Sequence, residues 1–529
     1  MTSRPAHVRL RAGLVVAAFL AAGCSTPPTA EGEVTYGLTL SPTGIDPHLN
    51  ASAELGIPLS SVYDTLVVQD PATGDFLPSL ASSWSVSDDG RSYTFHLRSD
   101  VRFHDGEPFD GEAVAANIDY VLDPDHHSQK AAFMLGPLED VVVGDSQTVT
   151  FLLTEPYPPL LDSLSQVYLG MASPKALETW GPADYQFHQV GTGPFRFQEF
   201  IPNDHITLLR NPDYAWGPSI YRHDTAQIER VSFSFYTDPA TRALALENGD
   251  ADILGELPPR DADRLERDGA FQVEAVPIPG QPMQFLFNTR RPPTDELVVR
   301  QALLLALDRP AIVETVFGTS SPVAQGPLSS NSWGFSAASS FPAHDQAASA
   351  RLLADAGWVP GSDGVLRRND VGLELTIVAP SWGNNPEVGQ LIEAAWEALG
   401  ARVELRVAPS FGQLKEAQEE GDYNAIGINF FGTDPDLLRP MFSSGAIYNW
   451  MGYSDLLLDS LLARAGGSAA APPERSELYT QVARIVRDQA LMIPIRDYVN
   501  LVAFQRRIQG LRFSYAGWFP LLIDLELAS

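Results

Sequence analysis

The chain has 529 residues, more than a single hydrophobic core usually supports, so at least two domains are expected. Hydrophobic residues make up 44% of the sequence and aromatic residues 10%, which is enough to fill sizeable cores and excludes global disorder. The formal net charge of −31 argues against nucleic acids and anionic membrane surfaces as partners.

The N-terminal segment has the pattern of an export signal. Arginines precede an apolar run over 12–22, and no acidic residue comes before Glu31. This run is too short to span a bilayer permanently. Cys24 follows it as the only cysteine of the chain, in a context (LAAGC) that resembles a bacterial lipobox. We therefore expect a signal peptide at 1–23, acylation of Cys24 and a flexible tether at 24–33, with ordinary cleavage nearby as the alternative.

The first half of the chain is predicted to be rich in strands. Alternating apolar residues at 34–40 predict a strand that ends at Ser41 and Pro42. Short antiparallel strands joined by Asp-Gly turns follow. A later strand ends at Tyr236 and Asp238, before a short helix. The loops after these two strands are therefore candidates for contact with a ligand.

Residues 372–436 predict consecutive strand, helix and strand units. Apolar residues alternate at 373–377 and 403–407, so strands are expected there, and an amphipathic helix is expected between them at 386–400. A third strand is expected over 425–430. Because crossovers within one sheet are nearly always right-handed, the three strands are expected to be parallel.

Ligands of open α/β sheets bind beyond the carboxyl ends of the strands. Two loops of the 372–436 unit lie at such ends, so we predict a binding rim there. Its candidate residues are Trp382, Asn384, Asn429, Phe430, Phe431 and Asp434. Trp382 either stacks on a ligand or covers the core, and Asp434 either binds a ligand or caps the next helix. Asn449 and Trp450 either face the same cleft or are buried.

The sequence contains no pattern of a catalytic device. His126 and His127 are the only adjacent histidines, but adjacent residues on regular structure point apart, and no further ligand lies at metal-binding spacing. No Gly-x-Ser-x-Gly elbow and no glycine-rich phosphate loop ending in Gly-Lys-Ser or Gly-Lys-Thr occurs. We therefore expect no catalytic residues, no metal and no cofactor.

A succession of motifs along the chain resembles the family 5 extracellular solute-binding proteins, the dipeptide, oligopeptide and nickel receptors of ABC importers. The resemblance runs from about residue 34 almost to the C-terminus, and the order and spacing of the motifs make it specific. The motifs are YDTLV at 63–67, PSLASSWSVSDDG at 78–90, YTFHLR at 93–98, VRFHDGEPF at 101–109, VGTGPF at 190–195, LRNPDY at 209–214, LDR at 307–309, AGW at 356–358, GYSD at 452–455 and LMIPI at 491–495.

The resemblance implies an α/β protein with the bilobed fold of periplasmic binding proteins, in which two mixed-sheet lobes are joined by two hinge segments. We expect the first lobe at 34–280, with a strand-rich subdomain at about 60–190, and the second lobe at 281–498. The segment 499–529 is expected to return to the first lobe. Two crossing segments permit closure over a ligand.

The resemblance also implies a function in uptake. The expected protein is a monomeric, lipid-anchored receptor outside the cytoplasmic membrane, whose partners are permease subunits with separate ATPases and no nucleic acid. Peptides are the leading solute class, and sugars, opine-like compounds and metal chelates are alternatives. A peptide-dependent sensor and a secreted enzyme on the same scaffold are further alternatives.

The family pattern implies some contacts and puts others in doubt. Tyr498 lies in the returning crossover, where related proteins have a tyrosine that contacts the ligand. Peptide-binding members place an aspartate shortly after the strand that ends at the rim, where it pairs with the ligand ammonium. Phe431 stands at that position here, and Asp434 comes after it. The family pattern therefore does not predict an anchor for an α-ammonium group at this position.

Overall fold

The computed structural model describes residues 32–42, 44–50, 52–467 and 472–528. Cys24 and the expected signal peptide lie outside these residues. No helix within the described residues is long and apolar enough to cross a membrane.

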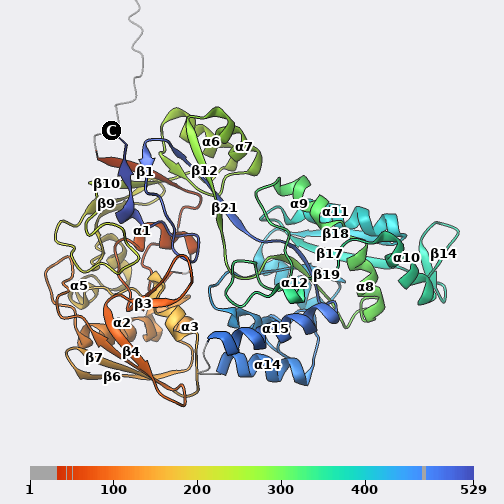
Figure 1. Ribbon diagram of the computed structural model, residues 1–529, viewed down its shortest axis with the longest axis horizontal. Helices are drawn as coiled ribbons and strands as arrows, with labels where there is room; N and C mark the ends of the chain where they lie inside the picture. Colours follow the sequence, from red (N-terminus) through yellow and green to blue (C-terminus); the bar gives the residue numbers. More distant parts are fainter. Residues whose placement is uncertain (1–31, 43, 51, 468–471, 529) are drawn as a thin grey trace, which may run out of the picture. The chain divides into compact units, whose positions relative to one another are not determined.

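A seven-stranded sheet forms the centre of the first lobe (Figure 1). The strand β1 (Glu33–Leu38) is parallel to β10 (Arg230–Phe235) on one side and to β11 (Ile253–Leu254) on the other. Val34, Tyr36 and Leu38 of β1 are buried, as the alternating pattern predicted. The other strands are β8 (Phe195–Ile201), β9 (His205–Arg210), β12 (Phe271–Pro277) and β21 (Val499–Gln505), and all of these pair antiparallel.

Smaller sheets and short helices complete this lobe. A four-stranded antiparallel sheet has the order β4-β5-β7-β6 and contains the predicted Asp-Gly hairpin. Its strands are β4 (Ala81–Val86), β5 (Ser92–Leu97), β6 (Leu138–Asp145) and β7 (Thr148–Leu153), and the remaining strand pairs are β2 (Val67–Gln69) with β3 (Phe76–Pro78) and β22 (Ile508–Gln509) with β23 (Glu526–Leu527). The helices are α1 (Gly56–Leu59), α2 (Gly111–Leu122), α3 (Ala131–Met134), α4 (Leu160–Ser163), α5 (Pro174–Asp184), α6 (Pro239–Asn248) and α7 (Pro259–Asp268).

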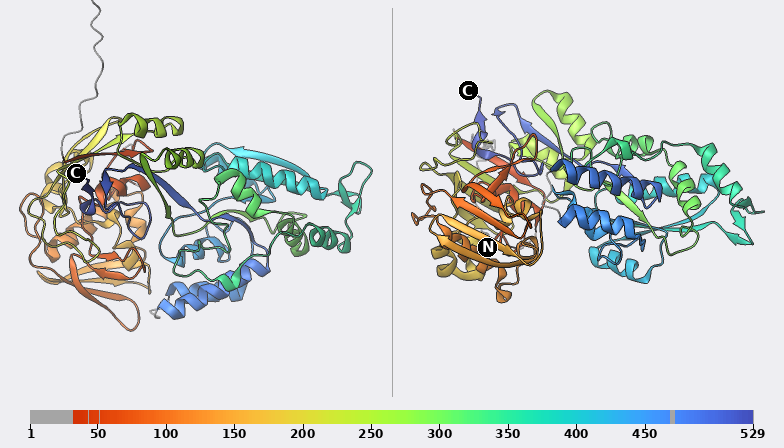
Figure 2. Two further views of the ribbon diagram at one scale, coloured as in Figure 1. Left: turned by 45° about the horizontal axis from the view of Figure 1, so that its top comes forward. Right: turned by 60° about the horizontal axis from the view of Figure 1, so that its bottom comes forward.

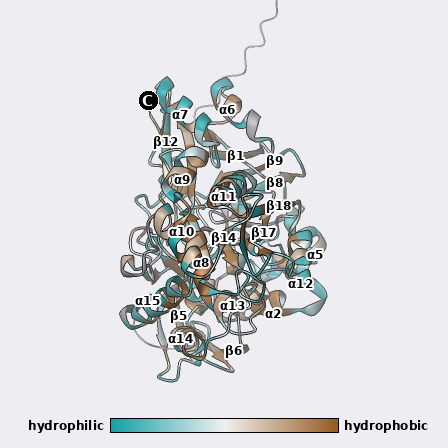
Figure 3. Cartoon of the chain, turned by 90° about the vertical axis from the view of Figure 1, so that its right-hand side faces the viewer, coloured by the Kyte–Doolittle hydropathy of each residue, from teal (hydrophilic) through white to brown (hydrophobic). Residues whose placement is uncertain are grey.

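A five-stranded sheet forms the second lobe, in the order β18-β17-β19-β13-β20. Its strands are β13 (Met283–Phe287), β17 (Glu374–Pro380), β18 (Arg402–Ala408), β19 (Ala425–Gly427) and β20 (Met492–Arg496), and a small sheet beside it contains β14 (Val359–Pro360), β15 (Leu366–Arg368) and β16 (Val371–Gly372). The prediction that β17, β18 and β19 are parallel is confirmed. Figure 3 colours β17 as hydrophobic and α12 as hydrophilic, as expected for an inner strand and an outer helix.

The helix between β17 and β18 has the predicted apolar face. This helix, α11 (Asn385–Leu399), packs on both strands and buries Val388, Ile392 and Trp396 at four-residue spacing. It ends where Gly400 takes a φ of 104°, a left-handed conformation that glycine adopts without a steric penalty. The other helices of the lobe are α8 (Leu297–Leu305), α9 (Arg309–Phe317), α10 (Gln346–Asp355), α12 (Phe411–Glu420), α13 (Arg439–Phe442), α14 (Leu456–Gly467) and α15 (Pro472–Asp488).

The third predicted strand is shorter than expected. The strand β19 ends at Gly427 instead of continuing to Phe430. The reason is that the Phe430 backbone bonds to the crossing segment: its N–H donates to Gln281 Oε1, and its carbonyl accepts from the Gln281 N–H, each at 2.9 Å. The end of this strand is therefore held by the hinge region.

Two short segments connect the two large sheets. One lies between β12, which ends at Pro277, and β13, which begins at Met283; the other is the pair Asp497-Tyr498 between β20 and β21. Figures 1 and 2 both show the blue strands β20 and β21 running from one sheet to the other. One hydrophobic core draws its buried members only from residues 283–495, whereas the other two are built from the first-lobe elements. The expected bilobed α/β architecture is confirmed.

Candidate binding site

The carboxyl ends of the parallel strands in both sheets converge on the second crossing segment. On the second-lobe side, the Tyr498 hydroxyl donates to Asn429 Oδ1 at 3.1 Å, and a Cβ atom added to Gly383 would lie 3.9 Å from that hydroxyl. On the first-lobe side, Asn500 Oδ1 accepts from the Glu256 N–H at 2.8 Å. Tyr498 and Asn500 are two residues apart, which is the spacing of residues on one side of an extended chain. The two edges therefore meet across 498–500.

Aromatic side chains gather at this meeting point. The Phe431 ring makes edge contacts with the rings of Tyr498 and Trp518, at centroid distances of 4.7 and 5.6 Å. Phe431 is 46% exposed and Trp382 is 45% exposed, which is high for large apolar side chains. Trp518, which comes from the C-terminal segment, was not predicted, because no local pattern near it marks a strand end at the rim. The exposed rings form a surface on which a ligand can stack.

Asp434 is already paired within the second lobe. Its carboxylate accepts from both terminal nitrogens of Arg475, at 2.9 and 3.1 Å, and from the N–H of Asp436 at 2.8 Å. That last bond caps the short helix η6 (Pro435–Leu438). Only 9% of Asp434 is exposed. Of the two predicted roles, the structure therefore shows the helix cap, and the carboxylate is not available to bind a ligand ammonium.

Two further candidates take part in the packing of the second lobe. Trp450 is 4% exposed and belongs to the hydrophobic core, which is the second of the two roles left open by the sequence. The Asn449 amide donates to the carbonyls of Ser443 and Tyr453, at 2.8 and 2.7 Å, and thereby holds the loop before α14. Phe430 packs on Tyr448 at a centroid distance of 4.5 Å and is half-buried. The exposed aromatic surface therefore consists mainly of the Phe431 and Trp382 rings.

The remaining candidates lie at the expected strand ends. Ser41 and Pro42 follow β1 and are partly exposed, and the Ser41 hydroxyl donates to Asn203 Oδ1 at 2.9 Å. Tyr236 follows β10 and donates from its hydroxyl to the Asp250 carbonyl at 3.0 Å. Asp238, two residues after Tyr236, is exposed. On the second-lobe edge, Asn384 follows β17 and has a φ of 62°. These residues belong to the two edges that meet at the crossing segment.

A polar contact connects the two lobes at a second place. The Thr433 hydroxyl, in the rim loop of the second lobe, donates to Asp162 of the first lobe. Gln166 Nε2 donates to the other Asp162 oxygen at 3.0 Å. Burial, followed by the nearby negative charge of Asp434, raises the pKa of the Asp162 carboxyl to about 7. No sequence pattern predicted this pair, because its partners are 271 residues apart.

A lysine lies close to the same contact. The Lys130 Nζ atom sits 3.6 Å from the centroid of the Tyr168 ring, a cation–π geometry. Burial lowers the pKa of Lys130 to about 8, although the charge of Asp162 acts in the opposite direction. The junction between the lobes therefore holds ionisable groups with little access to water.

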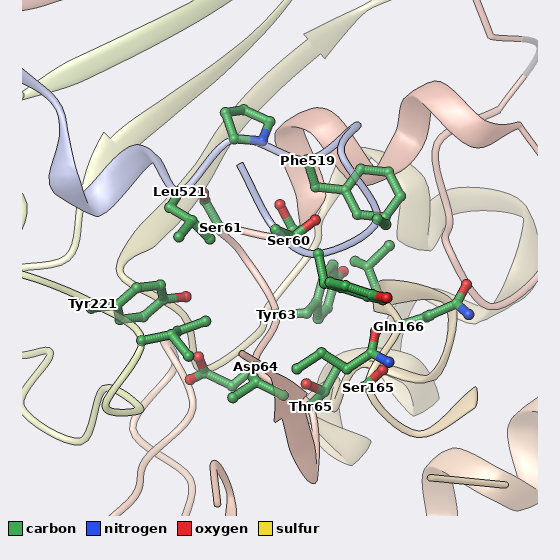
Figure 4. A pocket seen from close by; sticks show the side chains of 18 of the residues that line it. Ser60, Ser61, Tyr63, Asp64, Thr65, Ser165, Gln166, Tyr221, Phe519 and Leu521 are labelled. Atoms are coloured by element: carbon green, nitrogen blue, oxygen red, sulfur yellow. The ribbon is translucent and has the colours of Figure 1, made fainter. Parts of the chain in front are cut away.

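A small cavity lies beside this junction (Figure 4). Its volume is about 90 Å³, and its walls come from residues within 60–69, 165–167, 220–221 and 514–523, with Thr433 from the second lobe. Ser60 and Ser514 each have a buried hydroxyl with no hydrogen-bond partner among the described residues. A space of this size holds a few water molecules.

The one carboxylate in the cavity wall is fully engaged by protein groups. Asp64 accepts from the hydroxyls of Thr192 and Tyr214, at 2.9 and 3.0 Å, and from Trp216 Nε1 at 3.1 Å. Three donors of this kind satisfy a buried carboxylate. The cavity is therefore not a site for a cationic group.

In the described parts of the chain, no three His, Cys, Asp or Glu side chains come together as a metal would require. What the structure brings together is an arrangement for binding: two edges at strand ends, exposed aromatic rings and two crossing segments. The fold and this geometry define a two-lobed binding protein.

The chain belongs to the bacterial extracellular solute-binding proteins of family 5, whose model matches residues 75–449. Proteins of this family are the extracytoplasmic solute-binding components of ABC importers. The chain is 28% identical to a probable di/tripeptide-binding protein 5 of Pseudomonas aeruginosa, over 93% of this chain and 95% of the relative. It is also 28% identical to heme-binding protein A of Haemophilus influenzae, over 97% of this chain and 98% of the relative.

Solved structures agree with this assignment. The crystal structure of NikA from Brucella suis in complex with Fe(III)-EDTA superposes with a TM-score of 0.82 at 25% identity, over 94% of this chain and all of that one. The resemblance expected from the motifs is confirmed. These relatives are solute-binding proteins and not enzymes.

Proposed function

We propose that this protein is a receptor that captures a small polar solute, with peptides as the leading class, and presents it to an ABC permease. The observation that carries this proposal is the convergence of both sheet edges on Tyr498 and Asn500. A solute between those edges touches both lobes, so its binding energy favours the closed state. We place the first lobe at 34–280 and 499–529, with its strand-rich subdomain at about 60–190, and the second lobe at 281–498.

Peptides are supported by the names of relatives and by the chemistry of the rim. The relatives include di/tripeptide-binding and dipeptide-binding proteins. Exposed aromatic rings beside amide side chains accommodate variable side chains and bridging water. A non-peptide solute such as a metal chelate is the second candidate, because Asp434 is paired with Arg475 and a similar structure holds Fe(III)-EDTA.

The proposal includes binding without chemical change. Among the described residues, the rim presents aromatic rings, amide groups and charged groups that are paired. Closure of the two lobes on a solute held by such groups is sufficient for delivery to a permease and needs no reaction. Incubation of the purified protein with its bound solute is expected to return that solute unchanged, and turnover would contradict the proposal.

Native mass spectrometry of the protein purified from its own host tests the proposed function. We expect one small molecule to travel with the folded chain and to be released on unfolding. Isothermal titration with the identified solute then measures its affinity.

Replacing Trp382 with alanine is expected to weaken binding about tenfold through lost stacking. Because this side chain is exposed, the free energy of unfolding should change by less than about 0.5 kcal/mol. An unchanged affinity would show that Trp382 does not contact the solute.

We further propose that the receptor is monomeric and is held at the outer face of the cytoplasmic membrane by a lipid on Cys24. The lipobox-like sequence LAAGC and the absence of any other cysteine support this proposal. The Cys24→Ser variant is expected to move from the membrane fraction to the extracytoplasmic fluid or medium, without a change in solute affinity. Retention of the variant in the membrane would argue for another anchor.

A further inference from the structure

One carboxylate at the first-lobe edge has no role in the packing described above. Glu256 follows β11, at the same edge as the residues after β1 and β10. The register of β1 and β11, with Gly37 opposite Leu254, places Glu256 level with Thr39. Glu256 is an exposed residue, although the walls around it still desolvate its carboxyl. It therefore stands beyond the carboxyl ends of three parallel strands, where ligands of such sheets bind.

The backbone at Glu256 is held in a costly conformation. Its φ is 51°, in the left-handed region that side chains other than glycine rarely adopt. The Glu256 N–H donates to Asn500 Oδ1 at 2.8 Å, and its carbonyl accepts from Arg242 Nη1 at 2.9 Å. Two buried side chains thus fix the conformation from both sides. Strain maintained in this way is typical of residues that must point a side chain in a set direction.

The neighbouring charged groups are already engaged. The Glu54 carboxylate is 5% exposed and accepts from the N–H groups of Thr39 and Leu40, at 2.8 and 2.7 Å. The Arg242 guanidinium donates to three backbone carbonyls, those of Tyr236, Thr237 and Glu256. Among these groups, Glu256 is the carboxylate whose side chain is exposed.

A buried hydroxyl in the electrostatic neighbourhood of Glu256 has no hydrogen-bond partner among the described residues. The Tyr36 side chain is 1% exposed, and its hydroxyl has no hydrogen-bond partner among the described residues. Burial, with smaller effects from the charges of Glu54 and Glu256, raises the pKa of this phenol. Desolvation by the surrounding walls also raises the pKa of the Glu256 carboxyl, while Arg242 and Thr39 lower it.

On the opposite edge, aromatic rings are exposed, and the acid predicted in its rim loop is paired. Asp434 is paired with Arg475, and the Phe431 ring beside it is exposed. Asn500, which holds Glu256, lies two residues from Tyr498, which contacts Phe431. A carboxylate on one lobe and aromatic faces on the other are complementary to a cation held between them.

We propose that Glu256 is the residue that binds the cationic group of the solute, such as the free amino terminus of a peptide, from the first lobe. This inference rests on the proposed receptor function and makes it more specific. The ammonium donates hydrogen bonds to the carboxylate, and closure brings the rings of Phe431 and Trp382 toward its other side. A cation that contacts both lobes in this way favours the closed state.

Isothermal titration with Ala-Phe and N-acetyl-Ala-Phe tests this inference, since acetylation removes the cationic charge. The wild-type protein is expected to bind the free dipeptide about 10- to 100-fold more tightly than the acetylated one, as expected for hydrogen bonds to a charged group. Glu256→Gln is expected to lose most of this preference. Glu266→Gln, an exposed substitution on α7, is the matched control and should retain the preference.

Glu256→Gly is a second variant, and this substitution is not expected to disturb folding. Glycine adopts the observed φ without strain, so the melting temperature should stay the same or rise while the preference for the free amine is lost. Retention of the preference in both variants would overturn the inference. A co-purified solute without a cationic group would also overturn it and leave the receptor function standing. Absence of any bound solute would overturn the receptor function and the inference with it.

Discussion

Replacement of Arg475 with alanine is expected to lower the free energy of unfolding by about 3–5 kcal/mol. The guanidinium makes two hydrogen bonds to Asp434, and each of the two side chains is 9% exposed. It also lies 5.0 Å from the centroid of the Trp333 ring. Without Arg475, the Asp434 carboxylate remains buried with its charge uncompensated, which costs far more than the loss of an exposed ion pair. Urea unfolding at pH 7 measures this difference.

A double variant separates the loss of the pair from the loss of packing. In Asp434→Asn with Arg475→Ala, no charge is left uncompensated, so part of the stability should return. Arg484→Ala, at an exposed position of the same helix α15, should change the free energy of unfolding by less than about 0.5 kcal/mol. If the double variant is as unstable as Arg475→Ala alone, then lost packing and not the buried charge explains the effect.

Replacement of Asp162 with asparagine is expected to stabilise the protein increasingly as the pH rises. Burial, and then the charge of Asp434, raises the pKa of Asp162 from 3.8 to about 7 in the folded state. Between these two values the folded chain keeps a proton that the unfolded chain has lost. Stability of the wild-type protein therefore falls as the pH rises through this range, by at most about 4 kcal/mol.

The asparagine variant lacks this titration and keeps a side chain that can bond to Thr433 and Gln166. Near pH 4, close to the pKa of 3.8 in the unfolded chain, the wild type keeps nearly all of this stability, so variant and wild type should differ least. At pH 8 the difference should be greatest and should favour the variant. Urea unfolding at pH 4, 6 and 8 measures it, and the pH 4 measurement serves as the internal control. A difference that does not vary with pH would contradict the raised pKa.

Local sequence patterns were sufficient to predict the parallel strands β17 and β18 of the second-lobe sheet and the helix between them. The alternation at 373–377 and 403–407 depends only on which side chains face inward, and the helix α11 follows from four-residue spacing with Gly400 at its end. The motifs from 63–67 to 491–495 were likewise sufficient for the family. The rim loops at Trp382 and Phe431 followed from strand direction, because parallel strands end at one edge.

Local patterns could not assign partners across the chain. Asp434 had two open roles, and the choice depended on Arg475, which is 41 residues away and approaches through the packing of α15. Trp450 was assigned to the cleft or the core with equal justification, since an indole suits both. The strand end at Phe430 was misjudged because Gln281 of the crossing segment competes for its backbone.

The sequence by itself determined the family, the two-lobed α/β architecture and the loops that form one rim, because these depend on periodicity, turn residues and the order of motifs. Only the tertiary structure decided which charged groups are paired and which are exposed. Asp162 meets Thr433, and Glu256 is held by Asn500, through contacts that span 271 and 244 residues. Such contacts form only when segments far apart in the sequence fold against each other, so no local pattern records them.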